Sequence, residues 1–315
     1  MSEIKYTVAA QGRLLEALFA LMEGKSRTTV KALLRHRQVQ VNRRVTTAFD
    51  APLKAGDVIT VVAGRTPEPL QSPLLSIVYE DDALIVIDKR YGVLSMATDR
   101  ERERCAYFVL SEYVKRQRED NRIFIVHRLD RETSGLMLFA RSEQVKLAFQ
   151  GRWREMIVER RYVAVVEGAM PAAQGEIDVP LAENSLYKVY AAQGGVEALT
   201  RYRVLQAGDE YSLVELELET GRKNQIRAHL EHVGAPVAGD RKYGAKGSPA
   251  GRVCLHACRI DFVHPVTGEL FSFSTPVPAS FKAAVASSGK RAAGPKVRPR
   301  SQRPVGRTPS SRSRR

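Results

Sequence analysis

Short apolar segments, separated by only a few helical patterns, most constrain what residues 76–285 can fold into. Segments with the length and composition of strands occupy 83–88, 123–126, 136–140, 158–166 and 211–219. Helical patterns occupy 106–114, 142–153 and 224–233. Because strand and helix patterns do not alternate regularly, they predict an α+β domain whose sheet is mixed and largely antiparallel.

The charge of +15 is concentrated at the two ends of the chain. Residues 1–64 carry ten Lys and Arg against five Asp and Glu, and residues 289–315 carry ten against none. Basic ends on an electrically neutral body are typical of proteins that act on a polyanion, and nucleic acid is the partner we expect. A segment as polar as 286–315 cannot bury enough apolar surface to fold, so we expect a disordered basic tail that binds RNA non-specifically, or one that only solubilises the chain.

The pattern of residues 1–64 predicts a small α/β domain. Two helical stretches, 13–22 and 27–35, precede three short strands at 39–41, 45–47 and 58–62. The second helix carries cations at a spacing of four residues, which repel one another unless a polyanion binds them. A merely solvated helix face is the alternative. Proline-rich residues 65–75 read as a linker to the domain at 76–285.

Other features exclude several classes of protein. No apolar run is long enough to span a membrane and no signal peptide pattern is present, so we expect a cytoplasmic protein. Three cysteines provide no disulfide framework. Cys254 and Cys258 flank His256, but this is a weak metal signal, and we expect buried thiols and no metal site.

The segment around Asp130 is the strongest functional signal. It reads His-Arg-Leu-Asp at 127–130 and Thr-Ser-Gly-Leu at 133–136. Four arginines lie within a dozen residues of the aspartate: Arg122, Arg128, Arg131 and Arg141. Because nearby cations favour the charged form of a carboxyl group, we expect Asp130 to stay ionised. On this evidence alone the carboxylate is either a structural anchor or a nucleophile.

Five motifs in order resemble the RluA-type pseudouridine synthases. The longest are HRLDRETSGLMLFARS, ERRYVAVVEG and LETGRKNQIRAHLEHVGAPVAGDRKYG, with IDKRYGVLSMATD before them and LHACRIDFVHPVTGE after them. Residues 1–64 resemble the S-four-like RNA-binding domain that often precedes this catalytic domain. The resemblance implies that the protein breaks the N-glycosidic bond of a uridine in RNA and rejoins the uracil through a ring carbon. This isomerisation needs no cofactor.

The resemblance also assigns site residues. Asp130 corresponds to the family's catalytic aspartate, Arg227 to the basic residue paired with it, and Tyr162 to the active-site tyrosine that stacks on the flipped base. We expect Arg128 and Arg131 to face the RNA backbone. The S-four-like resemblance adds a row of RNA-binding cations: Lys25, Arg27, Lys31, Arg35, Arg37, Arg43 and Arg44.

Neighbouring residues are expected to shape the Asp130 loop. We interpret His127 as a residue that orders the loop by hydrogen bonding, and Thr133 and Ser134 as holding it through backbone hydrogen bonds. Gly135 is expected to permit the turn into the next strand, and Leu136 to lie in the core.

Three positions depart from the family pattern. Lys223-Asn224 replaces the usual Thr-His, which puts the contacts of that histidine in doubt. Lys89-Arg90 stands where Lys-Pro is usual, and Arg160 where lysine is usual.

Three functions remain in competition. An RNA pseudouridine synthase is the first; as its substrate we expect large-subunit ribosomal RNA, with transfer RNA as the alternative, and we expect a monomer. A non-catalytic RNA-binding or ribosome-assembly protein would not need Asp130, Tyr162 and Arg227 together. A glycoside or nucleoside hydrolase normally uses two cooperating carboxylates, whereas the motifs contain only one matched acid.

Overall fold

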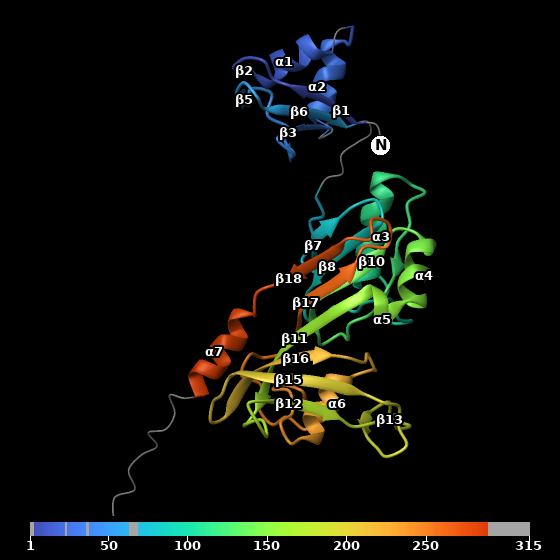
Figure 1. The fold of residues 1–315 in the computed structure, drawn as a ribbon, viewed down its shortest axis with the longest axis vertical. Coiled ribbons are helices and arrows are strands. Elements are labelled where there is room, and N and C mark those ends of the chain that lie inside the picture. The colour runs from blue at the N-terminus through green and yellow to red at the C-terminus, as the bar shows by residue number, and fades with distance from the viewer. Residues whose placement is uncertain (1–2, 23, 36–37, 63–68, 289–315) are drawn as a thin grey trace, which may run out of the picture.

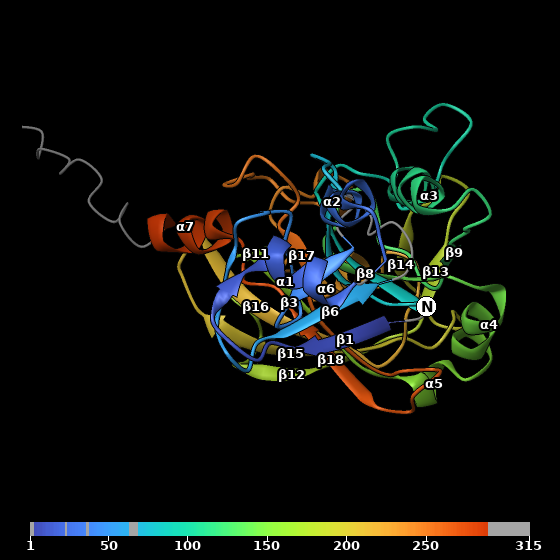
Figure 2. The same cartoon turned by 90° about the horizontal axis from the view of Figure 1, so that it is seen from above.

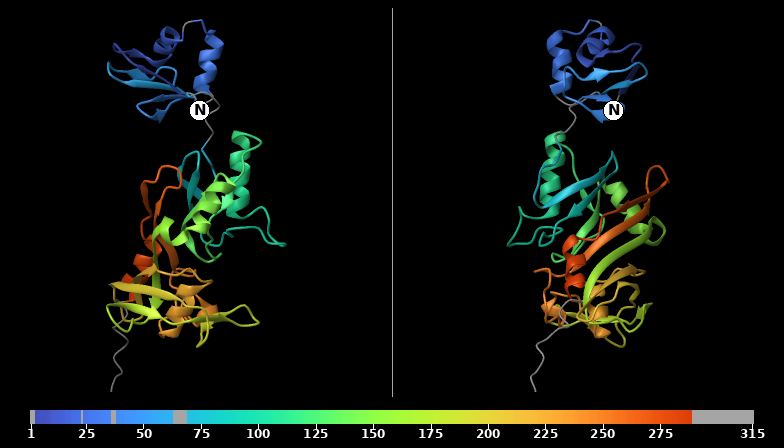
Figure 3. Two further views of the ribbon diagram at one scale, coloured as in Figure 1. Left: turned by 45° about the vertical axis from the view of Figure 1, so that its right-hand side comes forward. Right: turned by 90° about the vertical axis from the view of Figure 1, so that its left-hand side faces the viewer.

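The computed structural model describes residues 3–22, 24–35, 38–62 and 69–288 (Figure 1). Within this part of the chain no helix is long and apolar enough to cross a membrane. Residues 3–62 form a small unit with a hydrophobic core of its own, and the long sheet of the second unit follows. The views in Figure 3 place the small unit at one end of the molecule.

The small unit packs two helices on a four-stranded sheet. Its helices are α1 (Leu14–Leu21) and α2 (Arg27–Arg35), and its sheet has the order β1-β6-β3-β4. The strands of this unit are β1 (Glu3–Thr7), β2 (Gly12–Arg13), β3 (Val39–Val41), β4 (Arg44–Val45), β5 (Pro52–Leu53) and β6 (Val58–Val62). Both predicted helices and all three predicted strands are present, whereas β1 was missed because its residues are mostly exposed and show no clear alternation.

The second unit is built on a ten-stranded sheet. Eight strands follow the order β12-β15-β16-β11-β17-β10-β8-β7, with β18 added to β17 and β9 added to β10. All pairings are antiparallel except that of β10 with β17. The strands are β7 (Leu75–Glu80), β8 (Leu84–Lys89), β9 (Phe124–Ile125), β10 (Ser134–Ala140), β11 (Ile157–Glu167), β12 (Gln174–Asp178), β15 (Leu199–Gln206), β16 (Tyr211–Leu218), β17 (Leu255–Val263) and β18 (Leu270–Ser274). The predicted α+β class with a mixed, largely antiparallel sheet is confirmed.

Helices cover both faces of this sheet. Alternate residues of β8 and β10 belong to two different hydrophobic clusters, so both strands are buried on both sides. One cluster includes residues of α3 (Ala106–Gln117), α6 (Gln225–His232) and α7 (Ala279–Ser288). The other includes residues of α4 (Glu143–Gly151) and α5 (Trp153–Met156). Seen from above in Figure 2, α7 and α4 lie at opposite ends of the molecule.

Several predicted boundaries shift by a few residues. The predicted helix at 142–153 is two helices, α4 and α5, and Ser142 caps the first by accepting a hydrogen bond from the Val145 N–H. The predicted linker ends at residue 74, because β7 begins at Leu75, and its residues 65–68 lie outside the described part. The boundary at 286 was placed too early, because α7 continues to Ser288. The rest of the predicted tail, 289–315, also lies outside the described part.

Candidate active site

Asp130 lies on a loop between β9 and β10 that is held from one side by residues 90–95. The Ser95 hydroxyl donates to the Leu129 carbonyl at 2.5 Å and accepts from the Leu129 N–H at 3.1 Å. The Gly92 N–H donates to the Arg131 carbonyl, and the Arg131 side chain donates back to the Gly92 carbonyl. These reciprocal bonds fix the backbone on both sides of Asp130.

The far end of the loop is fixed by its approach to β17. Gly135 has φ +114°, and a Cβ at this position would lie 2.2 Å from the Ala257 carbonyl oxygen. Only glycine therefore allows the parallel pairing of β10 with β17 at this point. Leu136 is buried in the core, as predicted.

Polar side chains of the motif also hold the loop. His127 Nε2 accepts a hydrogen bond from the Leu138 N–H, which gives it the loop-ordering role that we predicted. Burial lowers the pKa of His127 to about 3, so the ring is neutral. The Thr133 backbone N–H donates to the Asp130 carbonyl. Ser134 differs from the prediction, because its hydroxyl contacts the side chains of His256 and Arg252.

Most of the arginines that lie near Asp130 in the sequence are not near it in space. Arg122 donates to backbone carbonyls at 119 and 121, Arg131 pairs with Glu101, and Arg141 pairs with Glu80. Three of the four arginines counted near Asp130 in the sequence therefore do not help to keep this carboxyl group ionised. The loop turns so that only Arg128 of the four acts appreciably on the Asp130 charge.

The Asp130 carboxylate is partly buried beside Arg227. Its side chain is 24% exposed, and its Oδ2 atom lies 3.9 Å from an Nη atom of Arg227. Burial raises the pKa of Asp130 above its ordinary value, even though Arg227, Arg128 and Lys89 act in the opposite direction. The sequence predicted the opposite direction because it counted nearby cations and could not count burial.

Arg227 is held chiefly by an acid that the motifs did not assign. Asp240, with a side chain 1% exposed, accepts two hydrogen bonds from the Arg227 guanidinium at 2.5 and 2.8 Å. The guanidinium also stacks over the Tyr243 ring, with its Cζ atom 4.8 Å from the ring centroid. Its remaining Nη atom faces Asp130 and Glu132. Asp240 and Tyr243 therefore hold the Arg227 guanidinium in place, and its remaining Nη atom is directed towards the acids of the site.

Asn224, which stands where the family usually has histidine, contacts Arg227. Its Oδ1 atom accepts from Arg227 at 3.2 Å, and its backbone adopts a left-handed conformation with φ +51° at the start of α6. Lys223 lines the same cavity as Arg227, and its ammonium pairs with Glu183. Although Lys223-Asn224 replaces the usual Thr-His, Arg227 thus keeps a polar partner at position 224.

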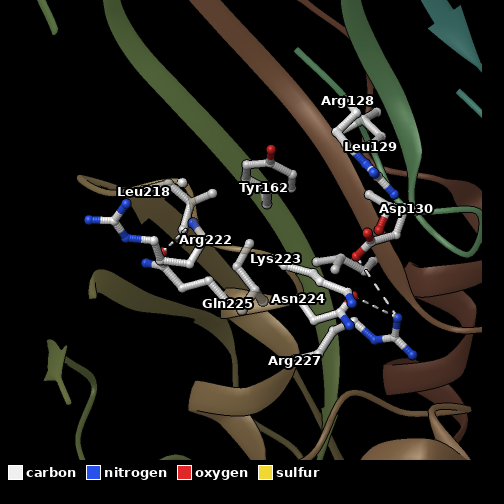
Figure 4. Close-up of a pocket in the computed structure, with 14 residues that line it drawn as sticks. Arg128, Leu129, Asp130, Tyr162, Leu218, Arg222, Lys223, Asn224, Gln225 and Arg227 are labelled. Carbon is white, nitrogen blue, oxygen red and sulfur yellow. Dashed lines mark hydrogen bonds and ion pairs between the residues drawn. The ribbon is translucent and has the colours of Figure 1, made fainter. Parts of the chain in front are cut away.

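Tyr162 stands on β11 between the two loops that carry Asp130 and Arg222 (Figure 4). The pairing of β11 with β17 shifts register between Arg161 and Tyr162, and such irregularities re-aim side chains next to active sites. Burial raises the pKa of Tyr162, so the phenol stays protonated, and its hydroxyl bonds to no described residue. The ring and its hydroxyl are therefore available to a ligand.

These three residues line one cavity of about 220 Å³, drawn in Figure 4. Asp130 and Tyr162 reach it from the loop and the sheet, and Arg227 reaches it from α6. Arg128 lies at the rim with an exposed side chain that hydrogen-bonds to no described residue. Arg131 does not line this cavity. Its side chain bonds to the Gly92 carbonyl and holds the loop in place.

The predicted RNA-binding cations of the small unit lie on its surface where they are described. Lys25, Arg27 and Lys31 are exposed around α2, and Arg43 and Arg44 are exposed at the turn from β3 to β4. The side chain of Arg35 and the whole of Arg37 lie outside the described part of the chain.

Lys89 also shapes the site, and we missed it in the sequence. Its side chain is fully buried, and its ammonium donates to the carbonyls of Val93 and Arg90 at 2.7 and 3.3 Å. It thus holds the turn that fastens the Asp130 loop. Burial lowers its pKa to about 8, although Asp130 and Glu132 act against this shift. Its place in the motif IDKRYGVLSMATD, at the end of an apolar strand pattern, was the signal that could have found it.

The three residues of the weak metal motif, on β17 and just before it, each make contacts of their own. His256 bonds Ser134 and Thr275, Cys254 is buried, and the Cys258 thiol contacts the Arg161 carbonyl. The described residues contain no group of three or more possible metal ligands.

Comparison with known proteins shows the family of the chain. A family model described as RNA pseudouridylate synthase matches residues 83–232, which include Asp130, Tyr162 and Arg227. Ribosomal large subunit pseudouridine synthase D of Vibrio cholerae is 34% identical over 285 residues, covering 84% of this chain and 88% of that protein. The uncharacterized RNA pseudouridine synthase YjbO of Bacillus subtilis is 33% identical over 235 residues, covering 72% and 82%.

A solved structure shares the fold as well. Human RNA Pseudouridylate Synthase Domain Containing 4 superimposes with a TM-score of 0.56 at 25% identity, covering 67% of this chain and 91% of that one. The motifs, the sheet and the relatives agree: the chain belongs to the RluA-type RNA pseudouridine synthases, which are isomerases.

Proposed function

We propose that this enzyme isomerises uridines of large-subunit ribosomal RNA, and that Asp130 carries the chemistry. The observation that carries the proposal is the convergence of Asp130, Tyr162 and Arg227 on one small cavity. A stacked uridine must leave its helix to reach such a cavity, which costs a few kcal/mol.

Asp130 is the only acid among the residues that line the cavity. Its oxygens are partly exposed and accept no hydrogen bond from a described side chain, so a ribose or uracil atom can approach them. A carboxylate in this setting acts as a nucleophile or a base, and either role can precede cleavage of the N-glycosidic bond.

Tyr162 and Arg227 assist in different ways. The Tyr162 ring provides a face on which a flipped uracil stacks, and its protonated hydroxyl can donate to the base. Arg227 favours the ionised form of Asp130 through its charge and, being anchored by Asp240, keeps a fixed direction.

The substrate class rests on the relatives and on the charged surface. The relative from Vibrio cholerae is named for the ribosomal large subunit. We propose that residues 1–64 form an S-four-like RNA-binding domain, whose exposed cations at 25, 27, 31, 43 and 44 contact phosphates. Phosphate contacts of this kind strengthen binding and help offset the cost of extruding the uridine.

Mapping pseudouridine in total RNA tests the proposal. The map from cells that lack the protein is compared with maps after complementation by the wild type, by Asp130→Asn and by Asp120→Asn. Asp120 is an exposed acid on the turn after α3, so its substitution is the matched control.

We expect one or more sites in large-subunit ribosomal RNA to disappear without the protein and to return with the wild type and Asp120→Asn only. Return of the sites with Asp130→Asn would remove Asp130 from the chemistry. Loss of sites confined to transfer RNA would refute the ribosomal assignment and leave the enzyme class intact.

A further inference from the structure

A second cavity, of about 410 Å³, adjoins the active site on the side of Tyr162. The two cavities share Arg128, Tyr162, Gly221 and Arg222 as lining residues. Its volume falls within the range of about 300 to 1,000 Å³ that is typical of small-ligand sites. The two cavities therefore adjoin along these four residues.

Four arginines line this second cavity, and none of them is neutralised within the described part of the chain. The side chains of Arg128 and Arg154 make no hydrogen bond or ion pair there, and those of Arg160 and Arg222 donate only to backbone carbonyls. The one acid of the lining, Glu219, already pairs with Arg201. Such a set of uncompensated guanidinium groups favours an anionic ligand with several acceptor oxygens.

An aromatic ring completes the cavity wall. Trp153 is half-buried, and the Arg160 guanidinium lies 5.5 Å from its ring centroid. The His127 ring meets the Trp153 ring edge-on at 6.0 Å. Gly221 lies beside the Arg160 guanidinium, 2.7 Å from where a Cβ at this position would stand. A flat ring beside cations suits a nucleobase attached to a phosphate.

Acidic side chains lie next to the second cavity. Beyond Trp153 the surface continues into a hollow that Arg154 and Arg160 also line and that carries Glu159, Asp178, Glu197, Glu217 and Glu219. Glu159 and Glu219 pair with arginines, whereas the other three acids form no ion pair with a described residue. This hollow is therefore less favourable to phosphate than the second cavity.

We propose that this second cavity is a subsite for the nucleotide next to the target uridine. Its phosphate binds Arg154 and Arg222, and its base lies against Trp153. The subsite would select RNA in which the neighbouring nucleotide is also unstacked. This inference rests on the proposed function, because it takes the adjoining cavity to hold a uridine of RNA.

Trp153 is the only tryptophan of the chain, so its fluorescence reports on this cavity. The full chain is titrated with uridine, with the dinucleotide UpU and with a short oligouridylate, and Trp153 emission is followed. We expect UpU and the oligouridylate to quench the emission and uridine alone to leave it nearly unchanged. The binding of labelled oligouridylate is measured in parallel by fluorescence anisotropy at several salt concentrations.

Arg154→Gln and Arg222→Gln test the cations, and Arg116→Gln, on an exposed position of α3, is the matched control. Each lost phosphate contact should reduce the slope of log affinity against log salt by about 0.7. We therefore expect both cavity variants to bind severalfold more weakly, with a smaller salt slope, and Arg116→Gln to behave as the wild type.

Oligouridylate that binds without quenching Trp153, or cavity variants with an unchanged salt slope, would overturn the proposal. The titration requires no turnover, and Asp130→Asn should show the same quenching as the wild type. A failure of this inference is thus separable from a failure of the proposed reaction, which the pseudouridine map alone decides.

Discussion

Replacing Asp240 by Asn tests whether the Asp240 carboxylate holds the Arg227 guanidinium in place. The substitution keeps the shape of the side chain and one acceptor oxygen, and it removes the negative charge. Arg227 and Asp240 are almost fully buried, with side chains 7% and 1% exposed, so water cannot replace the lost partner. Of the two guanidinium hydrogen bonds, at 2.5 and 2.8 Å, one is lost and the other weakened.

The cost follows from the strength of a buried charged hydrogen bond. Losing one such bond destabilises a protein by about 1.5 to 3 kcal/mol, and breaking a buried ion pair completely costs about 3 to 5 kcal/mol. We expect a loss of about 2 kcal/mol, because the asparagine oxygen still accepts one bond. For a domain of this size that lowers the melting temperature by roughly 4 to 8 °C.

Thermal unfolding followed by circular dichroism measures this effect. Glu176→Gln is the control, because it removes one partner of an exposed pair with Arg201, a type of interaction worth at most about 1 kcal/mol. The freed guanidinium should also move towards Asp130 and lower its pKa, which shifts the acid limb of kcat/KM to lower pH. If Asp240→Asn melts like Glu176→Gln, the proposed anchoring is refuted.

Three further predictions concern the Asp130 loop. Gly135→Ala should lower the free energy of unfolding by about 4 kcal/mol or more, because the new Cβ would meet a carbonyl oxygen of β17. The control Gly168→Ala, at a residue with φ +72° and open space around it, should cost only about 1 to 2 kcal/mol; urea unfolding measures both. Asp130→Asn should raise the free energy of unfolding at neutral pH. Burial raises the pKa of this carboxyl in the folded state, so the protonated group stabilises the fold below its ordinary pKa. That stabilisation is lost as the pH rises through the folded-state pKa. The gain should vanish in acid, and a constant gain at all pH values would contradict this assignment. The His127 imidazole should not titrate between pH 5 and 8 by NMR, and His127→Ala should cost about 1 to 3 kcal/mol because it leaves the Leu138 N–H without an acceptor; a normal titration would disprove the buried neutral ring.

Local chemistry explains which elements were predictable. Alternation and continuous apolar runs located β8, β10, β11 and β16, and the capping residue Ser142 marked the start of α4. The strands β12 and β15 were missed because polar and charged residues interrupt their apolar pattern. Charged residues occupy two of five positions in β12 and two of eight in β15, and Arg201 pairs with Glu176 across the exposed face. The helix α7 was missed because small residues leave little helical periodicity.

The sequence alone determined the fold class, because strand and helix patterns depend on residue type, and the resemblance of its five motifs to a family assigned Asp130, Tyr162 and Arg227 to one site. Only the tertiary structure decided which charges act on that carboxylate. It turned Arg131 and Arg141 towards other acids and brought Asp240 to Arg227. The physical reason is that electrostatic energy depends on distance and burial in space, and neither can be read from separation along the chain.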